Sequence, residues 1–149
     1  MTNSEIKKKI IYIIIPIIIG NLIGIITKNH VFYIKASIAP PDIVFPIVWT
    51  ILYGILGYTY YLLNNEYSTS LIKKIFILQL IINYIWPIMF FKFGLFFISF
   101  LWITLLDIVV LIMLLNLYKI NSKVFYLNLP YFIWLLFATI LNYMTYIVN

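Results

Sequence analysis

Long apolar runs, separated by short polar stretches, fill almost the whole chain of 149 residues. A helix rises about 1.5 Å per residue, so roughly 20 apolar residues cross a hydrocarbon core about 30 Å thick. Five runs reach this length, and together they leave little chain for a soluble domain. The pattern therefore predicts an all-α integral membrane protein, a single-domain bundle of five transmembrane helices.

The polar breaks set the expected limits of the spans. The first run follows three lysines at residues 7–9, as the core of a signal peptide would. It ends in Thr27 and Lys28 without the small residues of a cleavage site, so we read it as a retained span, kinked at Pro16. The five spans are expected at residues 6–27, 43–63, 71–91, 95–118 and 124–148.

The composition agrees with lipid as the solvent. Charged residues make up 9% of the chain, against about 25% in soluble domains. The net charge of +6 comes from dispersed lysines and not from a basic face, so we expect no nucleic-acid partner. More lysines fall on the side of the N-terminus than on the other, which predicts that this side is cytoplasmic. They are Lys7, Lys8, Lys9, Lys73, Lys74, Lys119 and Lys123, against Lys28, Lys35 and Lys92.

The sequence lacks the residue types that several kinds of site need. There is no cysteine, and His30 is the single histidine. Thiolate metal sites, disulfides and cysteine nucleophiles are therefore excluded, and neither a transition-metal site nor a histidine-dependent triad is expected. We expect no metal ion and no resident cofactor.

Polar and aromatic residues share single helical faces of the second, third and fifth spans, at about 100° per residue. Lipid offers no hydrogen bond to an amide, so Gln79, Asn83 and Asn142 should face inward. Such faces can serve as contacts between helices or as walls of a site for a flat apolar ligand. The faces are Phe45, Trp49, Tyr53, Leu56 and Tyr60; Gln79, Asn83, Trp86 and Phe90; and Trp134, Ala138, Leu141 and Thr145.

Two further features of the spans have structural readings. Asp107 is the one acid within a predicted span, where an ionised carboxylate costs on the order of 2.5–3.5 kcal/mol. We expect a structural or ligand-contact role for it, because a proton relay needs further titratable groups along its path. Gly20 and Gly24 form a G-x-x-x-G step, which predicts a close helix contact or a homodimer interface.

Three blocks of sequence resemble one known family. Residues 40–53 read P-P-D-I-V-F-P-I-V-W-T-I-L-Y and are followed by Gly57, which is similar to the signature of the translocator proteins, also called tryptophan-rich sensory proteins or peripheral-type benzodiazepine receptors. The block from Asn83 to Phe91 resembles that family's N-x-x-W-x-x-x-F-F, and the block from Leu129 to Asn142 resembles its L-x-P-Y-x-x-W-x-x-F-A-x-x-L-N. The blocks occur in the family's order over nearly the whole chain.

The resemblance implies a site inside the bundle, beneath the first loop, for porphyrin-like tetrapyrroles or other flat hydrophobic ligands. It implies a sensory, regulatory or transport role, with porphyrin as a ligand and not as a cofactor. Aromatic faces would stack on the ring, and the Asn83 amide would bond a polar edge. The expected ligand-binding residues are Trp49, Tyr53, Asn83, Trp86, Phe90, Trp134, Ala138 and Leu141.

Other functions stay open from the sequence alone. A transporter of porphyrin or sterol would need two access states, and an adaptor would act through a partner protein. An enzyme is not our expectation, although light-dependent porphyrin breakdown is an alternative that the resemblance would assign to Trp49 and Trp134.

The chain also departs from the family pattern. Asn29 and His30 stand where the family has Trp-Tyr, Ala36 replaces the proline of K-P-S, and Ile43 replaces a tryptophan, so the loop over the site is expected to differ.

Two departures lie in the later spans. Trp102 stands near the family's acid and Asp107 near its tryptophan, as if the two were exchanged. Tyr143 and Tyr146 have no basic residue after them, so the cholesterol motif of animal members is not expected here.

Overall fold

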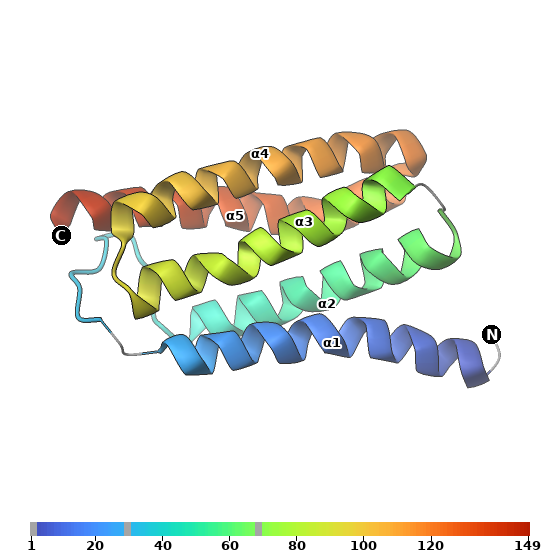
Figure 1. Ribbon diagram of the computed structural model, residues 1–149, viewed down its shortest axis with the longest axis horizontal. Helices are drawn as coiled ribbons and strands as arrows, with labels where there is room; N and C mark the ends of the chain where they lie inside the picture. The colour runs from blue at the N-terminus through green and yellow to red at the C-terminus, as the bar shows by residue number, and fades with distance from the viewer. Residues whose placement is uncertain (1–2, 29–30, 68–69) are drawn as a thin grey trace.

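The computed structural model describes residues 3–28, 31–67 and 70–149 and is built from long helices. The helices run alternately along the long axis of a bundle, with the N- and C-termini at opposite ends (Figure 1). Five of them are long and apolar enough to cross a membrane, which confirms the predicted all-α membrane class. The elements are α1 (Asn3–Thr27), α2 (Val44–Asn65), α3 (Ser70–Pro87), the π-helix η1 (Ile88–Lys92), α4 (Phe96–Ile120) and α5 (Ser122–Val148).

The helix ends lie close to the polar breaks of the sequence. When α3 and η1 are taken as one span, the largest difference is at α1, which begins at Asn3 where the prediction has Ile6. The start of α5 has a local cause, because the side chain of Asn121 accepts a hydrogen bond of 2.8 Å from the backbone N–H of Lys123 and so caps the helix.

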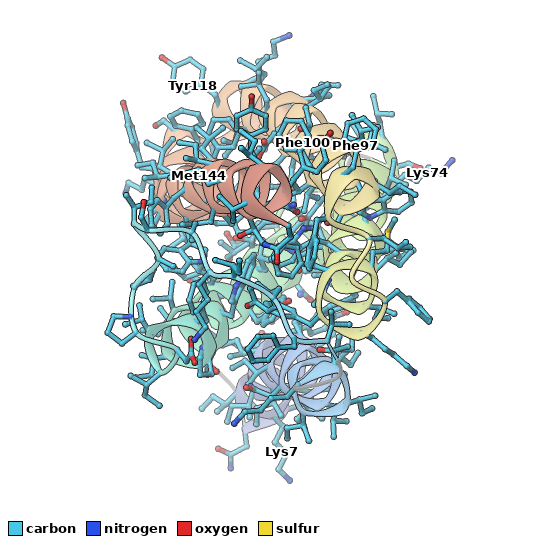
Figure 2. All side chains as sticks on the ribbon, turned by 90° about the vertical axis from the view of Figure 1, so that its left-hand side faces the viewer. Lys7, Lys74, Phe97, Phe100, Tyr118 and Met144 are labelled. Carbon is cyan, nitrogen blue, oxygen red and sulfur yellow. The ribbon has the colours of Figure 1, made fainter. Side chains whose placement is uncertain are left out.

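The helices close a ring around a packed interior. Viewed along the bundle, α1 is followed by α2, α5, α4 and α3, which returns to α1 (Figure 2). The interior holds large side chains with almost no exposure, among them Leu56, Phe76 and Tyr131. Outward-facing positions such as Ile25, Ile51 and Ile133 are more than half exposed. The apolar outer surface matches a lipid environment, in which such side chains lose nothing by facing out.

Two glycines let α1 and α2 approach closely. A Cβ atom on Gly57 would lie against the backbone carbonyl of Tyr12 and 2.7 Å from the Cα of Ile13. Pro16 has no N–H, so the Tyr12 carbonyl lacks its usual hydrogen bond within α1. Gly57 packs against the turn of α1 that lacks this bond. A Cβ on Gly20 would lie 2.7 Å from the Cζ of the Tyr53 ring. The two helices therefore fit only because these positions have no side chain.

The predicted G-x-x-x-G step divides between two environments. Gly20 packs inside the molecule, whereas a Cβ on Gly24 would meet no described atom within 4 Å. Within the chain, only the first glycine of the pair therefore has the close helix contact that the motif suggested.

Candidate ligand-binding site

A cavity lies between α2, α3, η1 and α5, under residues 31–43 of the loop that joins α1 to α2. It encloses about 40 Å³. Six of the thirteen lining residues are aromatic, and the loop contributes the charged side chains of Lys35 and Asp42 at what we call its mouth. The lining residues are Tyr33, Lys35, Ala36, Ala39, Asp42, Phe45, Trp49, Trp86, Phe90, Phe91, Ala138, Leu141 and Thr145.

The π-helix η1 shapes one wall of the cavity. Its wider turn closes with a hydrogen bond of 3.2 Å from the N–H of Phe93 to the carbonyl of Ile88. The rings of Phe90 and Phe91, adjacent in sequence, meet edge to face at 4.7 Å and both line the cavity. Gly94 then ends the segment with a φ of 64°, a conformation that other residues adopt only with strain.

Tyrosine and amide side chains form a hydrogen-bonded chain across three helices. The Tyr53 hydroxyl donates to Oδ1 of Asn83 at 2.7 Å, and Nδ2 of Asn83 donates to the Tyr131 hydroxyl at 3.1 Å. The Tyr131 hydroxyl donates in turn to Oε1 of Gln79 at 2.7 Å. All four residues are buried. The chain pairs buried hydroxyl and amide groups that lipid would leave without partners, except for Nε2 of Gln79, and it ties α2, α3 and α5 together.

A second pair of hydrogen bonds fixes the tryptophan of α3. The indole N–H of Trp86 donates to Oδ1 of Asn142 at 2.8 Å, and Nδ2 of Asn142 donates to the carbonyl of Phe96 at 2.9 Å. The indole ring of Trp86 is thereby held with one face toward the ring of Phe90, 5.5 Å away.

Five of the eight predicted ligand-binding residues line the cavity. These five are Trp49, Trp86, Phe90, Ala138 and Leu141. Tyr53 stacks against Trp49 at 5.6 Å and, with Asn83, belongs to the hydrogen-bonded chain. The amide of Asn83 is thus engaged by two tyrosines and is not among the lining residues, so its bond to a ligand stays a prediction.

Trp134 is also outside the lining. It packs edge to face on Phe45 at 6.0 Å and contacts Phe137 at 5.4 Å. Trp49 and Trp134, the candidate pair for light-driven chemistry, therefore do not share one wall of the cavity. Among the lining residues that sequence reasoning missed are Tyr33 and Phe91. The sequence did contain an indication that Phe91 belongs to the site, because Phe91 is part of the N-x-x-W-x-x-x-F-F block.

The loop over the cavity is fastened at several points. Nζ of Lys35 lies 2.6 Å from each carboxylate oxygen of Asp42. Ile34 donates its backbone N–H to Oδ1 of Asn149 at 2.8 Å and accepts from Nδ2 of the same residue at 2.9 Å. The ring of Tyr33 meets Phe90 edge to face at 5.4 Å. The first contact braces the loop internally, and the other two hold it against the end of α5 and against η1.

Charge and burial act on one titratable group of the loop. Burial, and then the negative charge of Asp42, raises the pKa of the Tyr33 hydroxyl. The hydroxyl, which is protonated at neutral pH in any tyrosine, therefore keeps its proton to a more alkaline pH than a free tyrosine does. Asn29 and His30, the predicted departures in this loop, lie outside the described residues.

Asp107 lies away from the cavity, between α4 and α5. The hydroxyl of Thr139 donates to its Oδ2 at 2.8 Å. Trp102, the other half of the apparent exchange, donates its indole N–H to the carbonyl of Ile82 at 2.9 Å. Both contacts join neighbouring helices, which favours a structural role for the pair.

Replacing Asp107 with asparagine should leave folding and ligand binding close to those of the wild type. The amide keeps an oxygen that can accept the Thr139 hydrogen bond. Asp107→Leu removes that acceptor and should lower the yield of folded protein. Size-exclusion chromatography and a porphyrin titration measure both effects. Preserved binding together with lost, proton-dependent flux in Asp107→Asn would instead assign the residue to a relay.

Comparison with known proteins identifies the family of the chain. The sequence model of the TspO/MBR family matches residues 12–147. The tryptophan-rich protein TspO of Archaeoglobus fulgidus is 35% identical over 117 residues, which cover 77% of this chain and 76% of that protein. The proteins of the same name from Chlorobaculum tepidum and Bacillus cereus are 30% and 26% identical over 116 and 122 residues, covering 74% and 77% of this chain and 72% and 76% of theirs. On this family match, and with five membrane-length helices, the chain is an integral multi-pass membrane protein that belongs to the TspO/MBR family.

Proposed function

We propose that the cavity beneath the loop binds porphyrin-like tetrapyrroles or other flat hydrophobic ligands, in a sensory, regulatory or transport role. One observation carries the proposal: the rings of Trp49, Trp86 and Phe90, from three different elements, surround a single cavity. Aromatic faces stack favourably on flat conjugated rings. At the mouth, the ammonium group of Lys35 would leave Asp42 and pair with an acidic substituent of the ligand's ring.

The enclosed space is too small for such a ligand. Ligand sites usually measure about 300–1,000 Å³, whereas this cavity encloses about 40 Å³. Binding therefore requires the loop to move outward from η1 and α5. The contacts that must break are those of Tyr33 with Phe90 and of Ile34 with Asn149. The described conformation is thus the closed form of the proposed site.

The test is a titration of the purified protein with protoporphyrin, followed by porphyrin absorbance. Trp49→Leu should weaken binding by about tenfold, because it removes one aromatic wall, worth about 0.5–1.5 kcal/mol beyond its buried area. Trp134→Leu is the matched control, since it removes the same indole from a position outside the lining.

Equal losses in the two variants would mean that both tryptophans act through packing. Wild-type affinity in Trp49→Leu would remove the cavity as the porphyrin site. Flux of porphyrin in proteoliposomes then separates transport from sensing, because a sensor binds without moving its ligand across the bilayer.

A further inference from the structure

A second hollow lies on the outer surface, where α1 and α2 cross. It measures about 370 Å³ and opens outward. Its walls are Lys9 and Ile13 of α1, Gly54, Ile55 and Tyr58 of α2, and Leu127 of α5. These helices are membrane spans, so the groove faces lipid and not the interior of the bundle.

One lining position of the groove, residue 54, has no side chain. A Cβ atom built on Gly54 would have its nearest described neighbour, Cδ1 of Ile17, at 3.5 Å, which is an ordinary contact. Gly57, one turn further, lies directly against the backbone of α1. The two glycines therefore have different roles. Gly57 allows close contact of α1 with α2, and Gly54 lines the groove beside that contact.

A single charge stands at one end of this apolar hollow. Nζ of Lys9 lies 4.4 Å from the centre of the Tyr58 ring, which holds the ammonium group over the groove. Lys7 and Lys8 are exposed on the same turn of α1. This end of the bundle also bears most of the other lysines and is the predicted cytoplasmic side, where membrane lipids are negatively charged.

We infer that the groove holds an acyl chain of an anionic phospholipid, with the lipid phosphate beside Lys9. The chain would lie over Gly54 against Ile13 and Ile55, where apolar contact is continuous. The ammonium of Lys9 and its neighbours complement a headgroup with net negative charge. A zwitterionic lipid presents the same phosphate together with a cation, so it binds more weakly.

The experiment measures thermal unfolding of the purified protein in mild detergent during titration with phosphatidylglycerol or with phosphatidylcholine of identical chains. Phosphatidylglycerol should raise the midpoint at lower concentrations than phosphatidylcholine. Lys9→Gln should raise the half-saturating concentration of phosphatidylglycerol about fivefold, the factor for one lysine at an anionic surface. Lys74→Gln is the matched control, since it removes the same charge from α3, on another side of the bundle (Figure 2).

A second pair of variants tests the position of the acyl chain. Gly54→Leu fills the groove and should abolish the response to both lipids, whereas Gly24→Leu places the same side chain in open space on α1 and should leave the response intact. Equal responses of the wild type to the two lipids, or equal effects of Lys9→Gln and Lys74→Gln, would overturn the inference. Should Gly54→Leu fail to fold, the lysine pair decides alone.

Discussion

Replacing Gly57 with valine should abolish folded protein. The new side chain would occupy the position of the Tyr12 carbonyl and lie within 2.7 Å of the Cα of Ile13. These are backbone atoms, so no rotamer change relieves the clash, and α1 must separate from α2. We expect a loss of about 3 kcal/mol or more, at the upper end of overpacking effects. The yield of monodisperse protein in mild detergent measures this loss of folded protein.

Gly24→Val is the control for this variant. It introduces the same β-branched residue into a membrane helix, but its Cβ meets no described atom within 4 Å. It should give a wild-type yield and unfolding midpoint. A monodisperse Gly57→Val protein with an unchanged midpoint would show that close approach of the two helices is not needed for the fold.

Asn83→Leu should destabilise the bundle by about 2 kcal/mol. The change removes the acceptor for the Tyr53 hydroxyl and the donor to the Tyr131 hydroxyl, both of which are buried. Hydrogen bonds between membrane helices average about 0.6 kcal/mol and reach about 1.7 kcal/mol, and a buried hydroxyl without a partner adds a desolvation cost. Chemical or thermal unfolding in detergent measures the loss.

Asn116→Leu provides the matched control, because the Asn116 amide donates only to the carbonyl of Ile112 in its own helix. A cycle with Tyr53→Phe tests the network directly. The double variant Tyr53→Phe/Asn83→Leu should lose less than the two single variants added together, since one hydrogen bond is counted in both. Simple additivity would contradict a connected chain.

The sequence predicted which side chains face inward better than it predicted their partners. Gln79, Asn83 and Asn142 point into the bundle because lipid penalises an unbonded amide, and that rule needs only the sequence. The pairing of Asn83 with two tyrosines spans three helices. Helical periodicity carries no information on such pairs, since it describes each helix alone.

Two differences between the predicted residues and the lining of the cavity have physical causes. Trp134 shares a helical face with Ala138, but its ring packs against Phe45, and Phe45 is the member of this pair that lines the cavity. Phe91 joins Phe90 in the cavity wall because η1 is wider than an α-helix, and a period of 3.6 residues cannot show that turn. The contact of Ile34 with Asn149 joins segments distant in sequence, beyond any local pattern.

The contacts that hold the loop closed affect the apparent dissociation constant of any ligand of the cavity. A site that binds only when open has an apparent dissociation constant equal to the intrinsic one divided by the open fraction. With an open fraction of about 1%, a ligand appears about 100-fold weaker than its own contacts make it. The two hydrogen bonds between Ile34 and Asn149 lower that fraction, because they must break when the loop opens. Part of what a titration reports can thus come from an equilibrium between Ile34 and Asn149, which do not line the cavity.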